Sequence, residues 1–101
     1  MRILIMFDLP TNTSSDRRHY RWFRKFLIDE GFMMMQESIY TKLCLNMNAA
    51  NIVMANIRKN KPPKGLVQTM IVTERQFSRM EFIVGEEEKI YVVSTERLTI
   101  L

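Results

Sequence analysis

The feature that most constrains the fold is an apolar run near the start of the chain, Ile3 to Phe7. Every position of this run is apolar, so a strand built from it presents apolar side chains on both faces. Such a strand belongs in the middle of a sheet and is covered on at least one side. Asp8 and Pro10 end the run, because proline cannot donate a hydrogen bond to a neighbouring strand. We therefore predict a central strand over residues 2–7, followed by a polar turn over 11–15.

The first predicted helix begins after Thr13 and ends before Gly31. Thr13 and Asp16 have the spacing of a capping box, and Gly31 stands where a left-handed cap belongs. At 100° per residue, apolar and basic side chains separate onto opposite arcs of this helix. The apolar arc holds Tyr20, Phe23, Phe26 and Leu27, and the basic arc holds Arg17, Arg18, Arg21, Arg24 and Lys25. The pattern predicts an amphipathic helix with a basic outer surface.

The rest of the chain alternates extended and helical patterns. Residues 32–35 and 39–45 are predicted as strands, 46–60 as a helix, 66–73 as a strand, 74–80 as a helical turn, 81–84 as a short strand, and 90–100 as one or two more. Residues 36–38 form a bend, a bulge or a tight hairpin, and periodicity does not choose among the three. The predicted apolar face of the second helix consists of Ala49, Ile52, Val53 and Ile57.

The order of these elements is strand, helix, strand, strand, helix, strand, which is the ferredoxin-like βαββαβ pattern of the α+β class. A chain of 101 residues has room for one domain with an antiparallel sheet. We place its core in residues 1–80 and extra C-terminal strands in 81–101. Helices would cover one face of the sheet, yet the strands are apolar on both faces. A second protomer or the tail must cover the other face, which favours a homodimer.

Charge and chain composition favour a nucleic acid as the partner. Lys and Arg outnumber Asp and Glu by 15 to 11, which gives a net charge of +4. Five basic residues and no acidic one occur between Arg17 and Lys25, and a second basic group consists of Arg58, Lys59, Lys61 and Lys64. Guanidinium groups match phosphate oxygens, so these groups suit a nucleic-acid backbone, although a solvated helix face is the alternative.

Other classes of protein are disfavoured. The apolar run of Ile3 to Phe7 is far shorter than the roughly 20 residues of a membrane span, so we expect no membrane partner. It is also too short for the apolar part of a secretory signal, so we expect a mature start. With one cysteine, Cys44, and one histidine, His19, the chain forms no internal disulfide and no Cys/His zinc site. We therefore expect a cytoplasmic protein and interpret His19 and Cys44 as structural.

Asp8 is the sharpest candidate for chemistry, because a carboxylate that follows five apolar residues needs solvent, a cation or hydrogen-bond donors. It could accept hydrogen bonds from the turn amides of residues 11–13. Alternatively, a two-fold axis could bring two Asp8 carboxylates together to hold a hard cation that polarises a phosphate and activates water. Trp22 flanks the basic arc and could stack on a base, but we favour a packing role.

The sequence resembles a known family through several segments in the same order. These are Asp8-Leu9-Pro10 after a buried strand, the Arg-rich helix with Tyr20, Phe23 and Leu27, Gly31-Phe32, and the segment Gln36 to Tyr40. Together they resemble the small CRISPR-associated Cas2 family, the partner of the CRISPR integrase. The later segments 64–66 and 72–77 resemble the branch of that family found beside a single large effector nuclease, the type II-A-like branch.

The resemblance implies a ferredoxin-like homodimer whose last strands, within 81–101, pair with the other protomer. It implies a scaffold for CRISPR spacer acquisition, joined by integrase subunits and bound to double-stranded DNA through Arg17, Arg18 and Arg21, with Arg24 and Lys25 as further candidates. It also implies an endonuclease acting on single-stranded RNA or on DNA, with Asp8 as catalytic residue and Mg²⁺ ligand at the Asp8 pair of the dimer. Two hypotheses stay open: an enzyme that hydrolyses phosphodiesters, and a purely architectural nucleic-acid-binding dimer.

Overall fold

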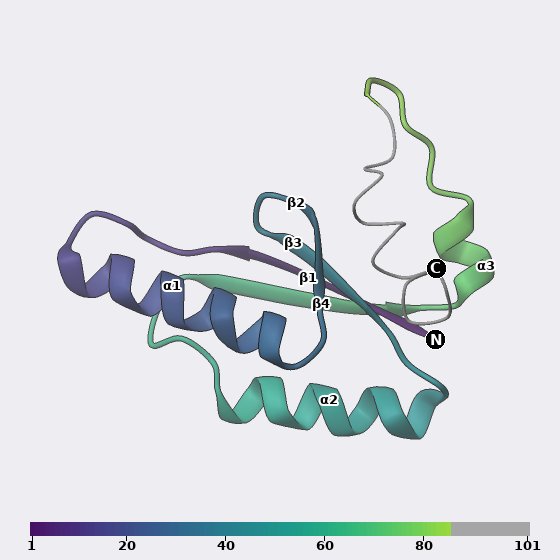
Figure 1. Cartoon of the computed structure of the whole chain (residues 1–101), viewed down its shortest axis with the longest axis horizontal. Helices are drawn as coiled ribbons and strands as arrows, with labels where there is room; N and C mark the ends of the chain where they lie inside the picture. The colour runs from purple at the N-terminus through teal and green to yellow at the C-terminus, as the bar shows by residue number, and fades with distance from the viewer. Residues whose placement is uncertain (86–101) are drawn as a thin grey trace.

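The fold is a four-stranded antiparallel sheet with two helices on one face (Figure 1). It is seen in a computed structural model that describes residues 1–85. The strands are β1 (Arg2–Asp8), β2 (Met33–Gln36), β3 (Ile39–Leu43) and β4 (Leu66–Val72), in the order β2-β3-β1-β4. The helices are α1 (Ser14–Asp29), α2 (Met47–Lys59) and the short α3 (Glu74–Ser78). This topology confirms the predicted ferredoxin-like α+β fold, with β1 in the interior of the sheet.

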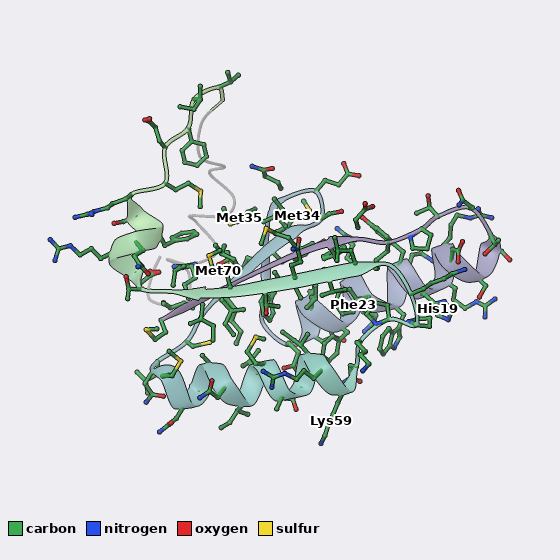
Figure 2. All side chains as sticks on the ribbon, turned by 180° about the vertical axis from the view of Figure 1, so that it is seen from behind. His19, Phe23, Met34, Met35, Lys59 and Met70 are labelled. Atoms are coloured by element: carbon green, nitrogen blue, oxygen red, sulfur yellow. The ribbon has the colours of Figure 1, made fainter. Side chains whose placement is uncertain are left out.

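The core lies between the sheet and the helix layer. Ile3, Ile5 and Phe7 alternate along β1 and are buried on the helix side of the sheet. Phe23 and Leu27 of α1 are fully buried against this core, and Figure 2 shows Phe23 between the ribbon of the sheet and its own helix. Burial of these side chains stabilises the fold by about 1.5–3 kcal/mol each.

Local sequence features define the ends of α1 as predicted. The Thr13 hydroxyl accepts a hydrogen bond from the amide of Asp16 at 3.0 Å, and the Asp16 carboxylate accepts one from the amide of Thr13 at 3.2 Å. This pair is the predicted capping box, and it satisfies amides that the first helical turn leaves unpaired. Gly31 follows the helix with a φ of +99°, in the left-handed region that favours glycine.

Residues 36–38, for which the sequence allowed a bend, a bulge or a hairpin, belong to a hairpin between β2 and β3 that also contains a bulge. Met34 pairs with Tyr40 and Gln36 with Ile39, so the register shifts between Met34 and Gln36. Ser38 turns the chain with a φ of +68°. The extra residue in β2 explains why period-two alternation failed to choose between hairpin and bulge.

The asparagines of α2 act mainly as capping and linking groups. The Asn46 side chain accepts a hydrogen bond from the amide of Ala49 at 2.9 Å and so starts the helix. At the other end, the Asn56 side chain donates to Glu30 beside α1 at 3.5 Å. Our placement of Ile52 on the apolar face is wrong, because its side chain is 65% exposed. The buried stripe of α2 is narrower and centres on Ala50 and Ile57.

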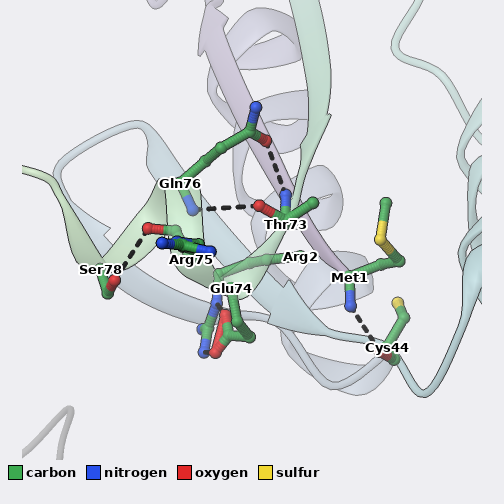
Figure 3. A network of polar contacts seen from close by, with 8 residues as sticks. All are labelled: Met1, Arg2, Cys44, Thr73, Glu74, Arg75, Gln76 and Ser78. Atoms are coloured by element: carbon green, nitrogen blue, oxygen red, sulfur yellow. Dashed lines mark hydrogen bonds and ion pairs between the residues drawn. The ribbon is translucent and has the colours of Figure 1, made fainter.

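The short helix α3 is tied to the start of β1 (Figure 3). The Arg2 guanidinium donates to both carboxylate oxygens of Glu74, at 2.6 Å from Nε and 2.8 Å from Nη2. It also lies 4.2 Å from the centre of the Phe77 ring. This contact fixes the chain after β4, because the guanidinium engages both the charge and the ring of one helix.

Beyond α3, residues 81–85 are exposed and carry no strand in this single chain, in contrast to the short strand predicted over 81–84. A strand is stable only when a neighbouring strand pairs with it, and these residues have no such neighbour among those described. The strands predicted over 90–100 lie outside the described residues. Their pairing with a partner protomer stays a prediction.

The sheet face turned away from α1 and α2 is largely apolar, and we call it the open face. Strand alternation places Leu4, Met6 and Asp8 of β1 on it, opposite Met70, Gln68 and Leu66 of β4 in the pairing register. Leu66 and Met70 are 55% and 53% exposed, and Figure 2 shows Met70 on the side of the sheet away from α1 and α2. An apolar sheet face of this kind is typical of an interaction surface.

Candidate functional site

The Asp8 carboxylate is exposed at the end of β1, beside the first residue of β4. Asp8 pairs with Leu66 in the β1–β4 ladder, and its side chain belongs to the open face. The turn amides of residues 11–13 donate no hydrogen bond to Asp8, and neither does any other group among residues 1–85. The amide of Thr13 donates to Asp16 instead, because the capping box uses it. Asp8 is therefore available to a ligand from outside the chain.

A glycine lets the loop before β4 approach Asp8 closely. Gly65 has a φ of +101°, and a Cβ at this position would stand 2.9 Å from the carbonyl oxygen of Asp8 and 2.7 Å from Cδ2 of Leu9. Any larger residue would push the loop away from the end of β1, in addition to its backbone strain. Gly65 thus fixes the place where β4 starts and where Asp8 is presented.

The neighbouring residue ties the same loop to α1. The Lys64 ammonium lies 3.2 Å from Oδ1 of Asp16, whose side chain is almost completely buried. Burial alone would raise the pKa of Asp16, but the hydrogen bond with Lys64, those with Thr13 and the Lys64 charge together lower that pKa below its ordinary value. A small pocket lined by Pro10, His19 and Pro62 adjoins this pair. His19 is half-buried in that wall, which agrees with the structural role predicted for it.

Three of the five basic side chains predicted to bind nucleic acid are already engaged within the chain. Arg17 donates to the carbonyl oxygen of Thr11 at 3.1 Å. Arg24 donates from Nε to the Tyr40 hydroxyl at 2.7 Å, and Lys25 pairs with Asp29 at 2.9 Å. All three remain exposed, so each keeps some capacity for a phosphate, but their geometry is set by the protein.

The other two basic side chains, Arg18 and Arg21, have no hydrogen bond or ion pair within residues 1–85. Both are exposed on the outer side of α1. An unpaired guanidinium offers five N–H donors in a planar fork, which suits phosphate oxygens. We call Arg17, Arg18, Arg21, Arg24 and Lys25 the α1 basic surface, and Arg18 and Arg21 are its unpaired part.

The structure does not bring Asp8 and the α1 basic surface together within one chain. Asp8 belongs to the open face of the sheet, whereas α1 covers the opposite face (Figure 1). Within residues 1–85, His, Cys, Asp and Glu side chains nowhere gather in threes that could hold a metal ion. A single chain thus supplies one carboxylate on one side and a basic helix on the other.

Comparison with known proteins gives the family. The family model described as CRISPR associated protein Cas2 matches residues 1–80. The chain belongs to the Cas2 family. A relative from Treponema denticola is 46% identical over the full length of both chains, and one from Lacticaseibacillus rhamnosus is 48% identical over the same span. Both relatives are named CRISPR-associated endoribonuclease Cas2.

A solved structure agrees with the fold. The crystal structure of Streptococcus pyogenes Cas2 at pH 6.5 matches 84% of this chain and 100% of its own, with a TM-score of 0.61 and 17% sequence identity. At that identity the likeness establishes the Cas2 fold alone. No helix within residues 1–85 has the length and apolar character needed to cross a bilayer.

The Cas2 match includes Asp8 and the whole of α1, and one side chain on that helix packs as expected while it stays more exposed than a core residue. Trp22, which we interpreted as a packing residue, is 45% exposed and stacks on Phe26 with a centroid separation of 6.0 Å. Its position beside Arg18 and Lys25 on the helical wheel was the available indication, since those residues lie on the solvent arc. The link between Arg24 and Tyr40 was missed, because it joins residues 16 positions apart.

Proposed function

We propose that this protein is a nucleic-acid-binding scaffold in CRISPR spacer acquisition, acting as a homodimer together with subunits of the CRISPR integrase. The observation that carries the proposal is the exposed, unpaired state of Arg18 and Arg21 on α1. These groups bind the phosphates of double-stranded DNA and gain free energy as condensed counterions are released. Membership of the Cas2 family supports the link to CRISPR. A buried lone cysteine, Cys44, supports a cytoplasmic location.

The homodimer is proposed from the open face. Its half-exposed side chains, Leu66 and Met70 among them, are the kind of surface that a second copy of the same sheet would cover. In such a dimer the helix layers lie on the outside, so the α1 basic surfaces of both protomers face solvent. Asp8 shares the open face, so a two-fold axis through that face brings the two Asp8 carboxylates toward one another.

Phosphodiester hydrolysis at the Asp8 pair is the second candidate. Two observations favour it: the exposed Asp8 carboxylate accepts no hydrogen bond within residues 1–85, and the relatives carry the name endoribonuclease. The carboxylate oxygens of Asp8 are the kind of ligand that Mg²⁺ prefers. Because one chain provides a single carboxylate at this place, the site depends on the Asp8 of a second protomer and on water. A magnesium ion bound there would supply Lewis-acid activation of a phosphate and of water.

The residues of the chain would divide the work in the same way under both candidates. Arg18 and Arg21 hold the backbone and fix its position without reading bases, so binding depends little on sequence. Gly65 fixes β4 against the end of β1 and so holds Asp8 where a partner sheet meets it. The candidates differ only in whether Asp8 takes part in bond cleavage.

One assay on the full-length chain tests the proposal and separates the two candidates. Wild type and Asp8→Asn are each incubated with labelled single-stranded RNA and duplex DNA, with magnesium or with EDTA, and both binding and cleavage are measured. The scaffold predicts that both proteins bind duplex DNA equally and that neither cuts. Magnesium-dependent cleavage that Asp8→Asn abolishes would make the nuclease primary. A folded wild type that binds no nucleic acid would refute both.

A further inference from the structure

Trp22 is the exposed end of a series of aromatic rings that begins in the core. Phe7 meets Phe23 edge-on at 5.3 Å, Phe23 stacks on Phe26 at 6.2 Å and 25°, and Phe26 stacks on Trp22 at 6.0 Å and 13°. Phe7 and Phe23 are buried, Phe26 is partly buried, and Trp22 is 45% exposed. The indole is therefore held by a fixed ring behind it while much of its surface remains in contact with solvent.

Two neighbours of Trp22 on the helix surface are cationic. Arg18 precedes it by four residues and Lys25 follows it by three, spacings that place both beside it on the helix surface. Arg18 has no partner within residues 1–85. α2 adds exposed cations to the same layer, and Figure 2 shows Lys59 directed away from the sheet. An aromatic ring of this kind, flanked by an unpaired guanidinium, favours an anionic ligand with a flat, unsaturated group.

We propose that Trp22 stacks on an unpaired base of a nucleic acid while Arg18 holds the adjacent phosphate. This inference rests on the proposed nucleic-acid-binding function and identifies the part of the ligand that this helix recognises. A base in an intact duplex is stacked on both sides, so only a single-stranded segment or an unpaired end presents a free face. Stacking on an aromatic ring is tolerant of sequence, in agreement with a surface that has no base-reading groups.

The ring series reduces the conformational entropy that Trp22 loses when a base stacks on it. An isolated surface tryptophan loses rotamer freedom when a base stacks on it, which weakens binding. Here the contact with Phe26 already orients the indole nearly parallel to the ring behind it. The base would extend an existing stack by one ring.

The experiment uses the fluorescence of the intact protein, because Trp22 is the single tryptophan of the chain. The protein is titrated with single-stranded DNA, single-stranded RNA, a blunt duplex, and the same duplex with an unpaired overhang. We expect quenching of the emission by both single strands and by the overhang duplex. The blunt duplex is expected to bind without comparable quenching. Comparison of the two single strands distinguishes RNA from DNA as the source of the unpaired base.

Affinity measurements on variants complete the test. Trp22→Leu should weaken binding of the single strands by about tenfold and leave the blunt duplex unaffected, whereas Trp22→Phe should retain most of the affinity. The matched control is Met47→Ala, which removes an apolar side chain of the same exposure, 45%, from the first turn of α2, outside the α1 basic surface, and should change nothing. Circular dichroism verifies that each variant is folded.

Two outcomes would overturn the inference in distinguishable ways. If single strands bind without quenching, or Trp22→Leu binds them as well as wild type, the stacking role is refuted while the scaffold function stands. If neither single strands nor duplex bind the folded wild type, the proposed function and this inference fall together.

Discussion

At the residue scale, Asp16 joins two elements through a single carboxylate. One carboxylate oxygen accepts a hydrogen bond from the amide of Thr13 in the capping box of α1. The other oxygen faces the ammonium of Lys64 in the loop before β4. Because these contacts favour the charged form, the pKa of Asp16 lies below its ordinary value near 3.8. A lowered pKa in the folded state means that this group stabilises the fold above the unfolded-state pKa. That contribution is lost as the pH falls through the folded-state value.

The lowered pKa of Asp16 predicts a pH-dependent difference between wild type and Asp16→Asn. The asparagine keeps an acceptor for the capping box but lacks the charge that faces Lys64, so the variant should melt at a lower temperature than wild type at pH 6–7. The gap in melting temperature should start to shrink as the pH falls below about 4, the ordinary pKa of an aspartate, because the unfolded wild type then takes up a proton that folded Asp16 takes up only at a lower pH. Thermal melts at a series of pH values measure the gap. A gap of constant size down to pH 3 would show that the Asp16 charge contributes nothing.

At the scale of the elements, α3 is held to the sheet by a charged contact, and a helix of five residues depends on such a contact for its stability. So short a helix is unstable alone, and none of its residues is buried. Arg2, which is nearly buried, supplies the anchor through Glu74 and the ring of Phe77. The hydrogen bond from Arg2 lowers the pKa of Glu74, against the smaller opposing effect of burial.

We expect Glu74→Gln to lower the free energy of unfolding by about 0.5–1 kcal/mol, a modest value because the Glu74 side chain is 48% exposed and solvent screens the pair. The control is Asp29→Asn, which breaks the Lys25 pair on α1, where both side chains are exposed, and should cost about 0–0.5 kcal/mol. Urea unfolding of the three proteins measures both effects. An equal or greater loss for Asp29→Asn would refute the anchoring role of Arg2.

The elements also show how far sequence reasoning reaches. The ends of α1 were predictable because Thr13, Asp16 and Gly31 act locally, within a few residues of the helix. The bulged hairpin was not, because a bulge depends on pairing with another strand. Ile52 was misplaced because the spacing of apolar residues in α2 leaves the width of the buried stripe undetermined.

The same limit applies to the candidate site. The pattern of an acid after a buried strand located Asp8, and helical spacing located the α1 basic surface. Which of its side chains are unpaired could not be predicted, since Arg24 is engaged by Tyr40 from a distant strand. The exposure of Trp22 likewise depends on how α1 sits on the sheet.

At the scale of the whole molecule, the two faces of the sheet have different roles. The helix face holds the core and carries the α1 basic surface on its outside, while the open face combines apolar side chains with Asp8. A dimer formed through the open face would leave both basic surfaces exposed on opposite sides. This arrangement suits a scaffold that spans a length of nucleic acid.

The dimer predicts a clear effect of charge on the open face. Leu66→Lys together with Met70→Lys should raise the dimer dissociation constant about a hundredfold or more, because each protomer loses two apolar contacts and gains two like charges. Ile52→Lys, at an exposed position on α2, should leave the dimer intact. Light scattering over a range of concentrations measures the dimer dissociation constant of each protein. Wild type that stays monomeric at micromolar concentration would contradict the dimer itself.

The most direct test of the central claim, that the unpaired arginines of α1 hold nucleic acid, is the salt dependence of duplex DNA binding. Arg18→Gln with Arg21→Gln is compared with a control of equal charge change, Arg75→Gln on α3 with Arg79→Gln at its C-terminal cap. This control lies at the far end of the molecule from the start of α1 (Figure 1). We predict that the α1 pair flattens the slope of log affinity against log salt by about two for each bound protomer, while the control leaves it near the wild-type value. Equal slopes for both double variants would contradict the claim and place the DNA elsewhere.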